Sequence, residues 1–373
     1  MRLRQEYGLM KRKDSKGKVV WYYWVYGDDN KRIYRSTGER TKAKAMDYVM
    51  SLRDEGRLGQ RDRTMMTLGD FATDFFVPGK CPIERNAHMR GKSMTKATLS
   101  VRRTALTEHI LPHFAKTPLS SITRAKVNRW LMDLPTTDKI SRSSANNHLV
   151  AFRMVMEEAV RQGLISENPC TKVENLGSDS KRRASFTTEE VRKLIGKPED
   201  WDDPMIRLMC LTSAVTGMRM GEIRALKSEC ISDTAILIKA SFSYEDGYKL
   251  PKNGKERVAP IPPSLRDELR SMQQKGAKYI FCIYDSEKPV SAAWIHRSLM
   301  KRMEKCGIKG KTFHSFRAYF NTEMMSANVN ETVVRAVIGH QNAVMTEHYL
   351  HLETGEFSQI RGVQDSLLGK ILA

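Results

Sequence analysis

The chain reads TFHSFR at residues 312–317, VIGH at 337–340 and HYLH at 348–351, and these three runs decide its fold. His314 and Arg317 are three residues apart, so on a helix their side chains lie on one face. His340 follows a glycine that suits a helix end, and Tyr349 comes later in an apolar-flanked segment. Arginine offers a planar fork of donors to phosphate oxygens, histidine moves protons near neutral pH, and tyrosine is a hydroxyl nucleophile. The runs therefore predict a site that handles a phosphodiester without a metal ion.

A fourth run, TGMRMGE at residues 216–222, makes the combination specific. An apolar helix over 205–215 precedes it, and the glycine predicts a tight turn that lets the Arg219 side chain leave the core. Arg219 also has an acidic neighbour in Glu222, and pairing between them is compatible with catalysis. With all four runs in place, the chain resembles the tyrosine recombinase family of phage-type integrases and Xer-type recombinases. The resemblance is specific over residues 183–355 and looser over the preceding domain.

Matched position by position, the resemblance implies six catalytic residues: Arg219, Lys252, His314, Arg317, His340 and Tyr349. It implies that the two arginines clamp the scissile phosphate, where one such donor is typically worth about 10²- to 10³-fold in rate. It makes Tyr349 the nucleophile, whose phenol, with an ordinary pKa of about 10, needs cations or a base to lose its proton. His314 is then the proton acceptor or hydrogen-bond partner of the nucleophile, and His340 adds a hydrogen bond to the phosphate.

The general acid is expected on a hairpin between a strand over 236–243 and a return strand over 257–261. The family places a mobile lysine there that protonates the departing 5′ oxygen, and the KNG run before the return strand selects Lys252. Such a role suits a lysine whose pKa is lowered by nearby arginines. Lys249 and Lys255 lie in the same loop, so both stay open as alternatives.

The charge of the chain favours a polyanionic partner. Lys and Arg number 63 against 43 Asp and Glu, a formal net charge of +20. Nucleic acid is the commonest partner of such a chain, and an anionic membrane surface is the competing one. No apolar run approaches the roughly 18 residues of a spanning helix, and residues 1–6 lack the apolar core of a signal peptide. We therefore expect a cytoplasmic, DNA-associated protein with no membrane partner.

Cysteine and histidine spacing argues against metal or disulfide chemistry. The six cysteines are scattered without a close pair, which disfavours a zinc motif and a disulfide framework. His109 and His113 are four residues apart, but Pro112 lies between them and we identify no acidic or cysteine partner for a metal site. We expect no cofactor and no metal.

Residues 1–62 are expected to form a unit of their own. The run KVVWYYWVY at 18–26 is rich in β-branched and aromatic residues, and 31–36 reads as a further strand. With a strand near 7–11 and a helix over 41–55, we expect a three-stranded sheet backed by one helix. This pattern resembles the arm-binding domain of phage-type integrases, whose sheet enters the major groove. Some of the aromatic residues belong to the core, and the expected DNA contacts are Lys11, Arg12, Lys13, Lys31, Arg32 and Arg35.

Residues 63–173 predict a helical bundle that looks like the core-binding domain of the family. Apolar periodicity indicates a short helix from Thr67 and longer ones over 96–114, 122–134 and 141–163. The segment 79–93, which holds a proline and several charges, is expected to be a loop or insertion. The expected DNA contacts are Lys96, Arg102, Arg103, Arg142, Ser144, Asn146 and Asn147, although a solvated helix face would explain each of them equally well.

The expected fold class is multidomain and mainly α with small β-sheets. After the sheet-plus-helix unit and the helical bundle comes a polar linker over 174–185 that ends in basic residues. A mixed α+β catalytic domain of the tyrosine recombinase type follows over 186–355. Residues 356–373 form an amphipathic tail, exchanged between protomers or packed on its own domain.

The resemblance implies a site-specific DNA recombinase, the integrase of a phage or other mobile element. It would cut and rejoin DNA through a 3′-phosphotyrosyl intermediate at Tyr349, which stores the bond energy without ATP or metal. The implied partners are double-stranded attachment sites, a homotetramer on two duplexes, and accessory DNA-bending or directionality proteins. Two alternatives stay open here: a type IB topoisomerase-like enzyme that relaxes DNA, and a non-catalytic DNA-binding regulator on the same fold.

Overall fold

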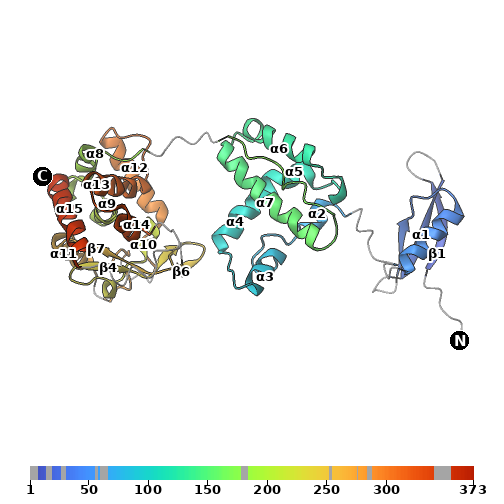
Figure 1. Ribbon diagram of the computed structural model, residues 1–373, viewed down its shortest axis with the longest axis horizontal. Coiled ribbons are helices and arrows are strands. Elements are labelled where there is room, and N and C mark those ends of the chain that lie inside the picture. The colour runs from blue at the N-terminus through green and yellow to red at the C-terminus, as the bar shows by residue number, and fades with distance from the viewer. Residues whose placement is uncertain are drawn as a thin grey trace. The chain divides into compact units, whose positions relative to one another are not determined.

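The computed structural model describes residues 7–13, 19–26, 31–54, 58, 66–177, 184–251, 254–274, 276–283, 288–339 and 354–373. They are mainly helical with small antiparallel sheets, as predicted (Figure 1). The chain divides into two compact units, and the main division falls between Asp179 and Ser180, inside the segment expected to be a linker. The domain boundaries stay predictions, and each part is described by itself. Among the described residues, no helix has the length and apolarity needed to cross a membrane.

The N-terminal part is a three-stranded antiparallel sheet with one helix. Its elements are β1 (Tyr7–Lys13), β2 (Val19–Tyr26), β3 (Arg32–Ser36) and α1 (Lys42–Asp54), with strand order β1-β2-β3. Side chains alternate along β2 because successive residues of a strand point to opposite faces. Tyr23 and Val25 form a small core with Val49 and Leu52 of α1. The predicted sheet backed by one helix is thus confirmed.

The other face of this sheet carries aromatic rings with arginines over them. Tyr22 pairs with Ser36 and Trp24 with Tyr34 across β2 and β3, so these residues share that face. The Arg32 guanidinium lies 4.2 Å from the centroid of the Trp24 ring and also approaches Tyr26. The Arg12 guanidinium lies 5.5 Å from Tyr22 and 5.0 Å from Tyr34. Cation–π attraction therefore holds two of the predicted DNA-contacting arginines against the sheet.

A helical bundle follows. Its elements are α2 (Leu68–Phe71), α3 (Pro82–Met89), α4 (Lys96–Thr104), the π-helix η2 (Ala105–Ile110), α5 (Leu111–Phe114), η3 (Leu119–Ser121), α6 (Arg124–Thr137) and α7 (Arg142–Arg161). The side chains of Thr123 and Ser141 cap α6 and α7 by accepting backbone N–H bonds. The apolar stripe of α7, including Leu149, Phe152 and Val155, is fully buried in the bundle core, as its periodicity predicted.

Two details of the bundle differ from the prediction. The expected loop over 79–93 contains helix α3, because Pro82 at its first turn has a φ already suited to a helix, and Ile83 supplies a buried contact. The expected helix over 96–114 is interrupted by η2, in which the Leu111 N–H bonds to the Leu106 carbonyl. Pro112 explains the wider turn, because its ring clashes with the carbonyl four residues earlier in a regular helix.

The second unit is built around α9 (Pro204–Thr216), which is buried from Ile206 to Thr216. A helix that is apolar on all sides belongs in the centre of a domain. The helices around it are α8 (Thr188–Ile195), α10 (Met220–Arg224), α11 (Pro263–Met272), α12 (Ala292–Lys305), α13 (His314–Ser326), α14 (Glu331–Ile338) and α15 (Thr354–Leu372), with short turns η4 (Pro198–Asp200) and η5 (Ser228–Cys230).

The strand expected over 236–243 is two strands. β4 (Ala235–Ile238) pairs with β7 (Arg257–Pro260), whereas β5 (Ser241–Ser243) pairs with β6 (Gly247–Lys249). A tight turn closes the second hairpin: the Asp246 N–H donates to the Ser243 hydroxyl at 3.2 Å, and Gly247 has a φ of +69°. The Asp-Gly pair at residues 246–247, where β6 begins, was the local signal for this turn.

The amphipathic tail forms α15 and packs on its own unit. Ile360, Leu367 and Ile371 are buried in the core of that unit. The Gln364 side chain, also buried, donates to the carbonyls of Val215 at 3.0 Å and Pro260 at 2.8 Å. Exchange of the tail between protomers stays a prediction.

Candidate active site

The turn after α9 positions Arg219. Gly217 adopts a left-handed conformation with φ +66°, and a Cβ there would lie 2.6 Å from the Phe320 ring. Only glycine satisfies both conditions, so the chain can reverse tightly against α13. Arg219 then caps α10, with its backbone N–H donating to Glu222 Oε2 at 2.8 Å. The predicted tight turn and the predicted Arg219–Glu222 pair are both present.

Helix α13 positions His314 and Arg317. It begins at His314, so Arg317 follows one turn later on the same face, as the spacing predicted. The Arg317 side chain is buried and donates from Nη1 to the Gly217 carbonyl at 2.6 Å and from Nη2 to the Ile338 carbonyl. Arg317 therefore ties the Arg219 turn to the C-terminal end of α14.

The buried carboxylate of Glu222 joins Arg219 to a further arginine, Arg257. Glu222, only 2% exposed, accepts from Arg219 Nη1 at 2.9 Å and from both terminal nitrogens of Arg257, at 2.8 and 2.6 Å. Arg257 Nε donates to the Val337 carbonyl at 2.8 Å. Arg257 was not among the residues predicted from the sequence. A usable signal was its place two residues before buried Ala259, which puts both on the core-facing side of β7, where an arginine needs an acidic partner.

The charges of this network are unbalanced. Arg219, Arg257 and Arg317 are three cations around one buried anion, Glu222. Burial lowers the pKa of Arg317 to about 9, and the charges of Arg219 and Arg257 act in the same direction. Burial alone would raise the pKa of Glu222, but hydrogen bonds and charges from Arg257 and Arg219 outweigh it and lower that pKa. Arg317 and Glu222 therefore stay charged at neutral pH, and the excess of arginines over carboxylates favours an added anion.

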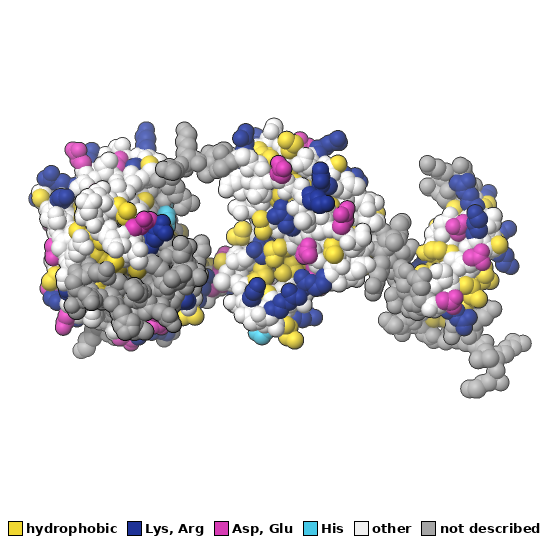
Figure 2. Space-filling model, in the orientation of Figure 1, with side chains coloured by type: hydrophobic (Ala, Val, Ile, Leu, Met, Phe, Trp, Pro, Cys, Tyr) yellow, Lys and Arg dark blue, Asp and Glu magenta, His cyan; other side chains and the backbone are white. Residues whose placement is uncertain are grey.

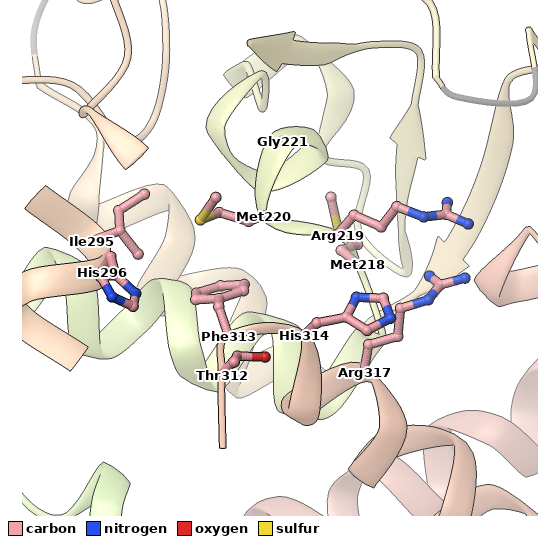
Figure 3. A pocket seen from close by; sticks show the side chains of 10 residues that line it. All are labelled: Met218, Arg219, Met220, Gly221, Ile295, His296, Thr312, Phe313, His314 and Arg317. Carbon is pink, nitrogen blue, oxygen red and sulfur yellow. The ribbon is translucent and has the colours of Figure 1, made fainter. Parts of the chain in front are cut away.

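A cavity of about 390 Å³ opens beside these residues. Figure 3 shows the guanidinium groups of Arg219 and Arg317 on the same side of it, with the His314 imidazole next to Arg317. The rest of the lining is mostly apolar: Met218, Met220, Gly221, Ile295, His296, Thr312 and Phe313. A ligand with an anionic group at the arginine end could place an apolar or aromatic group at the other end of the cavity.

The structure brings together three of the six predicted catalytic residues: Arg219, His314 and Arg317 line one cavity. The other three, Lys252, His340 and Tyr349, lie outside the described residues. Of the alternative lysines, Lys249 on β6 forms an ion pair with Asp246. Lys255 lies exposed before β7.

The predicted DNA contacts of the sheet fall on both of its faces. Arg12 and Arg32 lie on the aromatic face described above, whereas Lys11 pairs with Trp21 on the face towards α1 and has its ammonium 5.3 Å from that ring. Arg35 lies opposite Tyr23, also on the α1 face. The remaining two, Lys13 and Lys31, are exposed.

Some of the residues of the bundle that were predicted to contact DNA already form hydrogen bonds within the protein, and others are exposed. Figure 2 shows Lys and Arg side chains recurring across one face of the bundle. Lys96 and Arg142 are exposed near the starts of α4 and α7. Arg103 donates to the carbonyls of Thr73 and Phe75, both at 3.0 Å, so it also holds the turn after α2. Burial lowers the pKa of half-buried Arg102.

Among the polar candidates, Asn146 exchanges two hydrogen bonds with the backbone of Leu176, at 2.9 and 2.8 Å. Ser144 bonds to the cap residue Ser141, and Asn147 is exposed. Two of these three side chains therefore already have structural partners in the bundle.

Comparison with known proteins agrees with this architecture. Residues 184–356 match the phage integrase family, and residues 84–174 match the phage integrase SAM-like domain. The chain belongs to the phage integrase family and is a tyrosine site-specific recombinase.

The relatives are distant but cover most of the chain. A putative prophage phiRv2 integrase of Mycobacterium tuberculosis is 24% identical over 327 residues, covering 83% of this chain and 80% of that protein. A tyrosine recombinase of Thermosipho africanus is 22% identical over 243 residues, covering 64% of this chain and 83% of that protein. These similarities are spread over both the bundle and the second unit.

Solved structures share the fold. A lambda integrase tetramer bound to a Holliday junction aligns with a TM-score of 0.60 at 18% identity, over 92% of this chain and 97% of that one. The Tn1549 transposon integrase in complex with a circular intermediate DNA gives a TM-score of 0.61 at 18% identity, over 76% of this chain and 94% of that one.

Proposed function

We propose that this recombinase is the integrase of a phage or other mobile element and that it cuts DNA by forming a 3′-phosphotyrosyl bond at Tyr349. The observation that carries the proposal is the convergence of Arg219, Arg317 and His314 at one end of a cavity, where Arg219 also shares the single Glu222 carboxylate with Arg257. That excess of positive charge suits the phosphate of a DNA backbone.

In the proposed cleavage step, the Tyr349 phenol oxygen attacks the scissile phosphorus as the bond to the 5′ oxygen breaks. The phenol proton passes to His314, and Lys252 gives a proton to the departing 5′ oxygen. Arg219 and Arg317 hold the non-bridging oxygens, where charge accumulates in the pentacoordinate transition state. His340 adds a further hydrogen bond. A 5′-hydroxyl from a partner strand then reverses these steps and releases Tyr349.

The proposed partners follow from this reaction. Exchange between two duplexes needs four active sites, and the lambda integrase structure bound to a Holliday junction is itself a tetramer. We therefore propose a homotetramer on two double-stranded attachment sites, assisted by accessory DNA-bending or directionality proteins, in the bacterial cytoplasm. The N-terminal sheet would bind separate arm sites, since a small β-sheet fits the major groove.

The test is incubation with labelled DNA that carries the junction of the element, without metal, followed by denaturing gels. The expected result is a covalent protein–DNA adduct that disappears in Tyr349→Phe. Tyr244→Phe is the matched control, because this tyrosine of the same unit is 94% exposed and removing its hydroxyl should leave the adduct intact.

Two results would redirect the proposal. Relaxation of supercoiled plasmids that lack the junction would indicate a type IB topoisomerase-like enzyme. Tight binding without an adduct, even on nicked suicide substrates that trap the intermediate, would indicate a non-catalytic regulator.

A further inference from the structure

The Glu222 carboxylate has no spare acceptor capacity. An ionised carboxylate offers about four lone-pair positions, and Glu222 accepts four hydrogen bonds. Two come from Arg257 in a side-by-side fork, and two from Arg219, one of them from its backbone N–H. The Arg219 guanidinium is therefore limited to a single bond with the carboxylate next to it.

This limit determines what Arg219 can offer to a phosphate. An arginine beside a carboxylate prefers the bidentate fork, which would turn both terminal nitrogens away from any other anion. Here Arg257 already occupies that arrangement, with 5% of its side chain exposed against 23% for Arg219. Arg219 lines the cavity, whereas Arg257 lies behind Glu222.

We propose that Arg257 is a positioning residue for catalysis: by saturating Glu222, it keeps the guanidinium of Arg219 directed at the scissile phosphate. This inference rests on the proposed function of Arg219.

The contacts of Arg257 with α14 support the same role. Its Nε bond to the Val337 carbonyl fixes the end of that helix, and a Cβ on Gly339 would lie only 3.1 Å from its side chain. The Gly339 carbonyl is in turn 3.4 Å from Arg219 Nη2. One buried side chain thus sets both neighbours of the Arg219 guanidinium, the carboxylate on one side and the helix end on the other.

The first arm of the test is a double-mutant cycle on single-turnover cleavage of a suicide substrate. Arg257→Met keeps an unbranched side chain as far as the position of Nε but removes the fork, so Arg219 can close onto Glu222. We expect cleavage to slow by roughly 10²-fold, near the effect of losing one phosphate donor. Because Arg257 acts through Arg219, the Arg219→Ala, Arg257→Met double variant should cleave within about twofold of Arg219→Ala alone.

The second arm changes the charge of the substrate. A methylphosphonate at the scissile position removes the charge of the non-bridging oxygens that the arginines would hold. The defect of Arg257→Met, measured against wild type on the same substrate, should shrink to less than about tenfold. Arg257→Lys should fall between wild type and Arg257→Met on the normal substrate, because it keeps the charge but not the fork.

Arg224→Met is the matched control for loss of a buried arginine. Arg224 is 5% exposed and donates to the carbonyls of Val290 and Phe242, away from Glu222. Any slowing that it causes should multiply with Arg219→Ala and should not respond to the methylphosphonate.

The proposal is overturned if the losses from Arg257→Met and Arg219→Ala multiply, or if the methylphosphonate leaves the Arg257→Met defect unchanged. Either result would make Arg257 a residue of the fold alone. Failure of the proposed function looks different, because wild type itself would then form no adduct that depends on Tyr349.

Discussion

Replacing Arg317 by lysine separates the two tasks that this residue performs. Its guanidinium bridges the carbonyls of Gly217 and Ile338 inside the protein, and in the proposed reaction it also holds a phosphate oxygen. A lysine ammonium keeps the charge but is a single point, so it can reach only one of the two carbonyls. The other carbonyl is left buried without its donor.

The expected magnitudes follow from these contacts. A hydrogen bond from a charged donor contributes about 1.5–3 kcal/mol, so the second unit should lose about that much stability. Cleavage should slow by about 10²- to 10³-fold, because the fork that matches the phosphate is gone. Local stability is measured by hydrogen exchange of the amides in α13 and α14, and cleavage by single-turnover adduct formation.

Arg302→Lys is the control that makes the result interpretable. Arg302 also bridges backbone carbonyls, of Leu194 at 3.0 Å and Lys193 at 3.1 Å, but it does not line the cavity. It should lose comparable stability and keep its cleavage rate within a few-fold of wild type. Equal slowing of cleavage by both substitutions, or normal cleavage by Arg317→Lys, would refute the assignment of a phosphate to Arg317.

Three further predictions concern other parts of the chain. Lys252→Ala should slow DNA cleavage by about 10²- to 10⁴-fold. Its cleavage rate should recover on a substrate with a 5′-bridging sulfur, because that leaving group needs no acid. Lys249→Ala should cleave both substrates at a rate near that of wild type. Burial lowers the pKa of His148 to about 4 from an ordinary 6.5, so the unfolded chain binds a proton that the folded bundle rejects between these values. Stability of the bundle should therefore fall as the pH drops from 6.5 towards 4, and equal slopes for His148→Gln and wild type in thermal unfolding would contradict this. Gln364→Ala removes the hydrogen-bond donor of two buried carbonyls, so α15 should become more sensitive to limited proteolysis. An unchanged rate of proteolysis in this helix would contradict the prediction.

The sequence was sufficient to predict structure where all the residues of a pattern lie on one helix or strand. The spacing of His314 and Arg317 defines one helix face whatever surrounds it, and α13 presents them so. The alternating burial along β2 likewise needs only the period of a strand. That Arg219 would lie beside Arg317 was expected from the family resemblance, since no local pattern joins residues 98 positions apart.

The features that the sequence did not predict depend on contacts between elements or on weak local signals. Glu222 and Arg257 are 35 residues apart and meet only because the fold brings β7 next to α10. No local sequence pattern could therefore predict that they pair. The strand over 236–243 was read as one piece because the break between β4 and β5 falls at Lys239 and Ala240, which are not turn-forming residues. Helix α3 was missed because its single buried apolar residue, Ile83, is too weak a signal for a helix on its own.

The aromatic face of the N-terminal sheet has a consequence for the entropy of binding. A free arginine side chain samples many rotamers, and immobilising such a side chain at an interface costs entropy. Arg12 and Arg32 each lie over two rings of the sheet before any partner arrives. Contact with the rings restricts these rotamers before binding, so a DNA groove that took this sheet would meet two guanidinium groups that are already partly ordered.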